Sequence, residues 1–261
     1  GVLGARGCFF PPPAMKTTPT PSAADALMSA PPDPATLRQS ARFWDKMARK
    51  YAASPIADEA GIEASLRRTS ELLAESDQVL EIGCGTGTTA LRLAHRVRRL
   101  HATDVSSQMV AIAQEKLAAT PVAQLDFAVL DAAGAARQAP QAYDVVLAFN
   151  VLHLLPDLDG GLDAVWQALR PGGFFISKTP CVAEMNPLIP WVALPLARAL
   201  GLAPPVHCFQ GPTLEATIAR HGFEVLAVER HATKGRDVRP YIVARKPHQA
   251  ATVADPAPAP H

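Results

Sequence analysis

The chain has 261 residues, of which 48% are hydrophobic and 19% charged, and its formal net charge is +1. A chain of this size and composition can bury a sizeable core in one globular domain. The near-neutral charge balance provides no strong positive field, so neither a nucleic acid nor an anionic membrane surface is expected as a partner.

The two ends of the chain lack the apolar residues that a packed core needs. Residues 1–33 and 247–261 are rich in Pro and Ala, so we expect both segments to be disordered tails. The opening stretch is also too short and too broken by proline to be a secretory signal. The sequence does not begin with Met, and Met15 is a candidate for the first residue of the native chain.

Residues 34–76 are expected to form a helical cap in front of the main part of the domain. Asp33 can serve as the N-cap of a first helix, with Pro34 at its first position. A second helix is expected over residues 58–74. The first helix carries apolar side chains near helical spacing, namely Leu37, Trp44, Met47 and Tyr51.

From residue 77 onward, short apolar runs alternate with helical segments, a pattern typical of a parallel sheet with helices on both faces. The expected strands cover residues 79–83, 100–105, 125–131, 143–152 and 173–179. The expected helices cover residues 87–98, 107–118, a segment from Leu158 to Leu169 stopped by the Pro-Gly-Gly of 171–173, and residues 212–221.

The last two apolar runs, residues 223–231 and 239–246, are separated by only a short polar stretch. A parallel crossover needs about a dozen residues, so these two strands must pair antiparallel. The expected fold is therefore α/β, with a Rossmann-like, seven-strand, mostly parallel sheet, a reversed last strand and helices on both faces. Ligands of such sheets bind at the carboxyl ends of the strands.

A glycine-rich turn follows the first expected strand, in the stretch VLEIGCGTGTTA at residues 79–90. Gly83, Gly85 and Gly87 alternate there with other residues. Glycine tolerates positive φ and lets a ligand approach the backbone, and the start of the next helix offers unpaired N–H groups. A nucleotide-like ligand is expected. Thr88 stands where a dinucleotide-binding turn has its third glycine, which disfavours a hydride-transferring dehydrogenase.

Asp104 ends the second expected strand, about twenty residues after the turn, where a carboxylate can accept both hydroxyls of a ribose. Over residues 34–246 the chain resembles the class I S-adenosylmethionine (SAM)-dependent methyltransferases. The motifs that carry the resemblance are, in chain order, LEIGCGTG, TDVSSQMV, LDAAG, YDVVLAFNVLHLL and LRPGGFFISKT. Within that class the chain is most similar to the small-molecule branch that includes quinone-biosynthesis methyltransferases.

The resemblance implies that SAM is the cofactor and that a small molecule accepts the methyl group. Gly83, Gly85 and Gly87, with Cys84 between them, would let the backbone pass beneath the methionine part and the ribose of SAM. Glu81 would place negative charge near the SAM amino group. The alternative for Glu81 is that it only accepts hydrogen bonds from the N–H groups of its own turn.

The same resemblance implies which residues hold the adenosine end of SAM. Asp104 would bind the ribose hydroxyls, with Val105 and Met109 against the adenine. Asp131 would accept a hydrogen bond from the adenine amino group, beside the N–H of Ala132. The alternative for Asp131 is that it only caps the turn that follows it.

Further residues are expected around the methionine end and the reacting methyl group. Asn150 would contact the methionine moiety, and Tyr51 or Trp44 could close over the cofactor. Methyl transfer is an in-line displacement, so a general base is needed only when the acceptor arrives protonated. His153 is the candidate for that base, and a purely structural histidine is the alternative.

Residues 179–211 form a long, largely apolar segment that exceeds an ordinary connection. Prolines and an arginine interrupt it, so it does not qualify as a membrane span. We expect a helical lid over an acceptor pocket, which favours an apolar or aromatic acceptor. Extra core packing and contact with a membrane surface or a second subunit are the alternatives. Its polar groups that could meet an acceptor are Glu184, Asn186, His207 and Cys208.

The four cysteines form no disulfide framework and no metal-ligand pattern, so no metal is expected and a reducing, cytoplasmic setting is favoured. Two alternatives to methyl transfer remain. The first is transfer of an aminopropyl or other group from a SAM-derived donor, although residues 179–211 contain few of the acidic groups that would hold a polyamine. The second is a SAM-binding regulator without catalytic activity.

Overall fold

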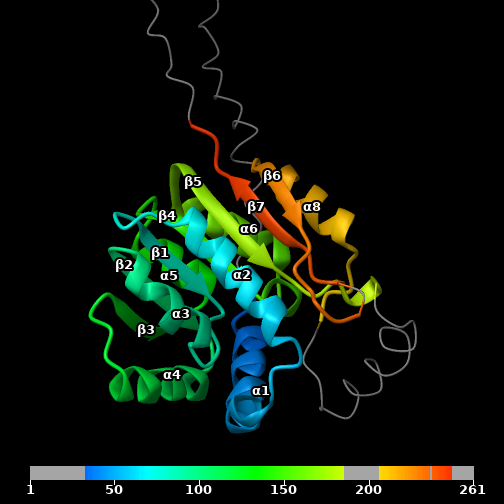
Figure 1. Ribbon diagram of the computed structural model, residues 1–261. Coiled ribbons are helices and arrows are strands. Elements are labelled where there is room, and N and C mark those ends of the chain that lie inside the picture. The colour runs from blue at the N-terminus through cyan, green and yellow to red at the C-terminus, as the bar shows by residue number, and fades with distance from the viewer. Residues whose placement is uncertain (1–32, 185–205, 236, 249–261) are drawn as a thin grey trace, which may run out of the picture.

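The computed structural model describes residues 33–184, 206–235 and 237–248, and Figure 1 shows a central sheet covered by helices on both faces. The sheet has seven strands in the order β3-β2-β1-β4-β5-β7-β6. The strands are β1 Gln78–Ile82, β2 Arg99–Asp104, β3 Leu125–Val129, β4 Tyr143–Phe149, β5 Leu169–Lys178, β6 Glu224–Glu229 and β7 Tyr241–Arg245. Strands β1 to β5 run parallel, and β7 lies antiparallel between β5 and β6. The predicted fold class, including the reversed last strand, is confirmed.

Apart from α5, the helices of the described residues follow the predicted order. They are α1 Pro34–Ala53, α2 Glu59–Leu72, α3 Thr88–Leu93, α4 Ser107–Ala119, α5 Ala132–Gln138, α6 Leu158–Ala168 and α8 Gly211–Arg220. Asp33 caps α1 as predicted, because its side chain accepts a hydrogen bond from the N–H of Ala35. Helix α3 ends earlier than predicted and continues into a 3₁₀ turn, Ala94–Arg96.

The core has two halves because successive residues of a strand point to opposite faces of the sheet. On one face, strand residues pack with α2, α3 and α4, among them Val79, Val145 and Ile176. On the other face, strand residues pack with α5, α6 and α8, among them Leu80, Val146 and Phe175. Each fully buried side chain of this kind stabilises the fold by about 1.5–3 kcal/mol.

One local prediction is wrong, and one helix of the structure was not predicted. Strand β5 begins at Leu169 and passes through the Pro-Gly-Gly of 171–173, which was expected to precede it. The backbone of Gly172 and Gly173 exchanges hydrogen bonds with Lys246, so these glycines extend the ladder instead of ending it. Helix α5 was not predicted, and it forms where Asp131 caps an alanine-rich segment by accepting from the N–H of Gly134.

Helix α1 is positioned by α4, as Figure 1 shows at the lower end of the molecule. Ala48 of α1 packs with Met109 and Ile112 of α4. Asp45 of α1 accepts hydrogen bonds from the hydroxyl of Ser106 (2.7 Å) and from the N–H of Gln108 (3.0 Å), at the start of α4. This docking holds α1 beside the carboxyl ends of the first strands.

Both predicted tails lie almost entirely outside the described residues, and so do residues 185–205 of the predicted lid, including Asn186. No described helix has both the length and the apolar character that a membrane crossing requires.

Candidate functional site

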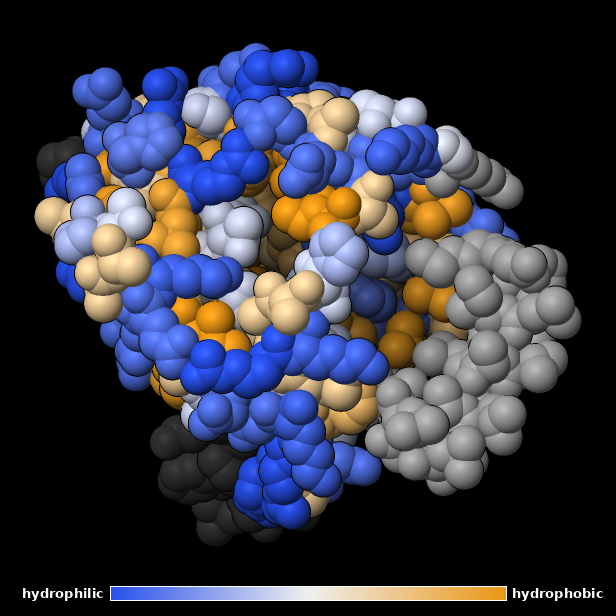
Figure 2. All heavy atoms as spheres, turned by 60° about the horizontal axis from the view of Figure 1, so that its bottom comes forward, coloured by the Kyte–Doolittle hydropathy of each residue, from blue (hydrophilic) through white to orange (hydrophobic). Residues whose placement is uncertain are grey.

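A cavity of about 450 Å³ opens at the carboxyl ends of β1, β2, β3 and β4, next to α1. Figure 2 views the molecule from the end on which α1 lies, and the surface there is hollowed between polar and apolar side chains. This location matches the expectation for a largely parallel sheet.

All predicted site residues except Gly87 line this cavity. They are Tyr51, Glu81, Gly83, Cys84, Gly85, Asp104, Val105, Met109, Asp131, Ala132, Asn150 and His153. Trp44, proposed as a second cover over the cavity, also lines it.

The three glycines of the turn all have positive φ, but they have different surroundings. A Cβ on Gly85 would meet nothing nearer than the Tyr51 ring at 4.0 Å, so this backbone is open to the cavity. A Cβ on Gly83 would collide with the side chain of Val151. A Cβ on Gly87 would lie 2.6 Å from the Phe127 ring, so Gly87 is required by packing beneath the turn. Of the three glycines, only Gly85 has open cavity space at the position where a Cβ would stand.

Asp104 fastens the end of β2 to the glycine turn. Its carboxylate accepts hydrogen bonds from the N–H groups of Gly85 and Ser106, both at 2.9 Å. Burial raises the pKa of this carboxyl, and the two N–H donors oppose that shift. Each carboxylate oxygen keeps a lone pair for a further donor in the cavity.

Glu81 is an unusual group because its carboxyl is buried at 2% exposure and its Oε2 has no hydrogen-bond partner among the described residues. Burial, helped by the nearby negative charge of Asp104, raises the pKa of Glu81 to about 8. The alternative role for Glu81 was to accept hydrogen bonds from the N–H groups of its own turn. In the described structure no N–H of the turn donates to it. A buried orphan carboxyl facing a cavity favours a cationic ligand group.

Asp131 and Asn150 occupy the ends of β3 and β4. Asp131 caps α5, because its Oδ1 accepts a hydrogen bond from the N–H of Gly134 at 2.7 Å. The capping role is therefore present, and it uses one of the two carboxylate oxygens. Asn150 has a left-handed backbone with φ of 55°, and its N–H donates to the carbonyl of Lys178 at 2.7 Å. Left-handed conformations at non-glycine residues cluster at functional sites.

His153 lies in the 3₁₀ turn Leu152–Leu154 that follows β4. Its Nδ1 is buried and has no hydrogen-bond partner within the described part of the chain. Burial is the largest cause that lowers the pKa of His153, and the positive charges of Arg239 and His207 lower it further, to about 4. The imidazole is therefore neutral near pH 7.

Several cavity residues were not predicted because they come from distant parts of the chain. Leu37 and Ser40 belong to α1, Pro180 follows β5, and Arg239 precedes β7. None of these four residues belongs to a recognisable local sequence motif, so only the fold brings them to the cavity. His207 lies beside the site, because its N–H donates to the carbonyl of His153 at 2.8 Å.

Comparisons with known proteins show what this domain is similar to. Residues 80–175 match a family model described as a methyltransferase domain. The chain is 37% identical over 99 residues to an uncharacterized protein of Synechococcus, covering 37% of this chain and 24% of that protein. It is 29% identical over 125 residues to an uncharacterized methyltransferase of Mycobacterium bovis, covering 46% of this chain and 61% of that one. A highly reducing polyketide synthase of Gibberella zeae is 34% identical over 114 residues, which is 40% of this chain but 4% of the synthase.

Solved structures show the same fold. The cyclase SpnF superimposes with a TM-score of 0.63 at 18% identity, over 85% of this chain and all of that one (100%). A SAM-dependent methyltransferase from Mesorhizobium loti superimposes with a TM-score of 0.56 at 20% identity, over 72% of this chain and 98% of the other.

Proposed function

We propose that this chain, whose residues 80–175 match a methyltransferase domain, is a class I, SAM-dependent enzyme that transfers a methyl group from SAM to a small organic acceptor. The observation that carries the proposal is the cavity, where the open turn at Gly85 lies beside the carboxyl groups of Glu81 and Asp104. SAM carries a sulfonium and an ammonium group. The acidic end of the cavity therefore matches its charge.

The methionine and ribose parts of SAM fit the ends of β1, β2 and β4. The orphan Oε2 of Glu81 would pair with the amino group of SAM. Asp104 would accept the ribose hydroxyls with its remaining lone pairs. Asn150 would contact the methionine moiety, and Tyr51, which is half-exposed opposite Gly85, would close over the cofactor.

The adenine would lie toward the ends of β2 and β3. Met109 is buried at the start of α4 and Val105 precedes it, so both present apolar surface to the cavity. Asp131 and the N–H of Ala132 would meet the edge of the base, since the capping bond to Gly134 occupies only one carboxylate oxygen.

The raised pKa of Glu81 predicts that cofactor affinity depends on pH. A pKa of about 8 keeps Glu81 protonated in the free protein below that pH. Pairing with an ammonium group favours the ionised form, so binding of S-adenosylhomocysteine releases a proton. The affinity should therefore rise toward pH 8, by up to about tenfold per pH unit. Calorimetry between pH 6 and 8 in buffers of different ionisation enthalpy measures both effects.

The variant Glu81→Gln is the control for this dependence. It should bind S-adenosylhomocysteine more weakly at pH 8 than the wild type and without proton release. Proton release that persists in the variant would assign the ionisation to another group.

The chain's own part in the reaction is to align the acceptor and exclude water, because bound SAM supplies an electrophilic methyl group. Apolar residues at and beyond the end of β4, together with one residue after β5, line the cavity, namely Phe149, Val151, Leu154, Leu155, Pro156 and Pro180. This lining favours an apolar or aromatic acceptor.

His153 is the residue proposed to accept a proton from the acceptor. Its ring is neutral near pH 7 and its Nδ1 is unpaired among the described residues, but burial disfavours a lasting imidazolium. The variant His153→Gln should keep its affinity for S-adenosylhomocysteine within about twofold and lose about a hundredfold in kcat on protonated acceptors. Initial rates together with calorimetry measure the two quantities, and an undiminished kcat would make His153 structural.

The proposed function is tested by release of S-adenosylhomocysteine from SAM in the presence of phenols, quinols, amines, thiols and carboxylates. The expected result is turnover of at least one acceptor together with cofactor binding. The fold alone does not establish methyl transfer, since the cyclase SpnF shares it. Binding without turnover would favour a SAM-binding regulator, and loss of an aminopropyl group from a decarboxylated donor would favour the other transferase class.

A further inference from the structure

The charges around the cavity are separated by sign. The acidic lining residues Glu81, Asp104 and Asp131 come from the ends of β1, β2 and β3. Among the described residues, Arg239 is the only lysine or arginine that lines the cavity, and it comes from the loop between β6 and β7. A cationic cofactor therefore fits one end, and the other end presents a positive charge.

The backbone that carries Arg239 is held in place by Asp237. The Asp237 carboxylate accepts hydrogen bonds from the N–H groups of His231 and Ala232, both at 2.7 Å, and from the N–H of Arg239 at 2.9 Å. The Arg230 guanidinium donates to the Asp237 carbonyl at 2.6 Å. These contacts hold residues 230–232 close to residues 237–239 of the β6–β7 loop.

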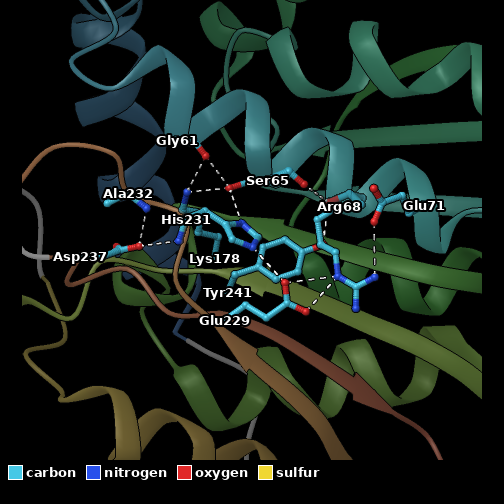
Figure 3. A network of polar contacts seen from close by, with 11 residues as sticks. Gly61, Ser65, Arg68, Glu71, Lys178, Glu229, His231, Ala232, Asp237 and Tyr241 are labelled. Atoms are coloured by element: carbon cyan, nitrogen blue, oxygen red, sulfur yellow. Dashed lines mark hydrogen bonds and ion pairs between the residues drawn. The ribbon is translucent and has the colours of Figure 1, made fainter.

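A partly buried polar network then links this loop to α2 and β5, as Figure 3 shows. Ser65 of α2 contacts His231 Nδ1 at 3.0 Å and accepts from the Lys178 ammonium at 2.7 Å. His231 Nε2 lies 3.0 Å from Glu229, which also accepts from Arg68 at 2.9 Å. The backbone of Arg239 is thus linked to this network through Asp237 and His231.

The guanidinium of Arg239 has no hydrogen bond or ion pair with any described residue, in contrast to Arg68 and Arg245, which pair with Glu229 and Glu224. Its charge nevertheless reaches the cavity, because it contributes to the lowered pKa of His153 and opposes the raised pKa of Tyr51. An arginine that lines a cavity and has no partner among the described residues is suited to bind a carboxylate through two parallel N–H···O bonds.

We propose that Arg239 selects the acceptor: its guanidinium binds a carboxylate or comparable oxyanion group of the molecule that receives the methyl group. The proposal rests on the proposed function and adds a charge to the acceptor class. An apolar or aromatic body would lie against the apolar lining beyond β4, with its anionic group at Arg239. An anionic acceptor is also attracted to the positively charged cofactor, which favours their joint binding.

The test compares carboxylates with their uncharged amides. Benzoate, phenylacetate and octanoate, and the matching amides, are titrated by calorimetry into the wild type and Arg239→Gln, with and without saturating S-adenosylhomocysteine. At least one carboxylate should bind the wild type more tightly than its amide, and Arg239→Gln should lose about tenfold or more of that affinity. Arg239→Lys should recover part of it.

The control variant is Arg245→Gln, which removes the same charge from an arginine paired with Glu224 outside the cavity. It should behave as the wild type. Equal carboxylate binding by wild type and Arg239→Gln, or no preference for any carboxylate over its amide, would overturn the proposal.

S-adenosylhomocysteine and 5′-methylthioadenosine distinguish the other source of a carboxylate, the amino-acid end of the cofactor. If Arg239→Gln weakens S-adenosylhomocysteine about tenfold but leaves 5′-methylthioadenosine unchanged, Arg239 serves the cofactor and the proposal fails. Unchanged affinity for both, with loss of the carboxylate preference, supports it. A wild type that binds neither nucleoside would contradict the proposed function, while the carboxylate titration of the free protein still decides the role of Arg239.

Discussion

Replacing Gly87 with Ala should lower the free energy of unfolding by about 2–5 kcal/mol. Gly87 has φ of 74°, a left-handed conformation that strains any residue with a Cβ. The new methyl group would also lie 2.6 Å from the Phe127 ring and 2.8 Å from the Ala113 methyl, both of which belong to the packed core. Strain and overpacking therefore add. Urea denaturation followed by circular dichroism measures the change.

Gly85→Ala is the matched control for the Gly87 variant. Gly85 has φ of 54°, so the backbone strain is similar, but its Cβ would meet open space. This variant should lose only about 1–2 kcal/mol of stability, while its affinity for S-adenosylhomocysteine falls because the methyl group enters the cavity. Equal stability losses in the two variants would contradict the packing role of Gly87.

The largest loss of cofactor affinity is expected for Asp104→Ala. The substitution removes the carboxylate proposed to bind the ribose hydroxyls, and it also frees the N–H groups of Gly85 and Ser106. Loss of charge-assisted hydrogen bonds should weaken binding of SAM and S-adenosylhomocysteine by about 1–3 kcal/mol, or roughly tenfold to a hundredfold. Calorimetry on the folded variant measures the change directly.

Asp126→Ala is the comparison variant for Asp104. Asp126 lies on β3, where it pairs with Arg99 and His101 outside the cavity. Its removal should leave cofactor affinity unchanged. Wild-type affinity in Asp104→Ala would exclude Asp104 from the ribose site, whatever its effect on stability.

The part of the site that could be predicted from the sequence is local. The turn from Glu81 to Gly87 and the acid Asp104 follow from strand ends and glycine spacing, and the sheet brings them together through the parallel pairing of β1 and β2. His153 and Asn150 were placed by the same reasoning at the end of β4. These residues lie near strand ends, where a parallel sheet fixes their neighbours.

Other features could not be predicted because they depend on contacts between distant segments. Arg239 reaches the cavity only because β7 inserts beside β5 and Asp237 folds the preceding loop. The different surroundings of Gly85 and Gly87 depend on Tyr51 and Phe127, which no spacing rule links to the turn. Likewise, the Pro-Gly-Gly of residues 171–173 predicts a helix stop, but hydrogen bonds with Lys246 make it part of β5.

The insertion of β7 between β5 and β6 has a consequence for biosynthesis. A nascent chain emerging from the ribosome presents β5 before Tyr241–Arg245 has been translated, so the β5 side of the growing sheet has open backbone donors and acceptors. Such an exposed strand invites pairing with other chains. Translation products that stop ahead of this segment should therefore be recruited by chaperones or precipitate. Pairing of β7 with β5 then covers the open edge of β5 and brings Arg239 to the cavity.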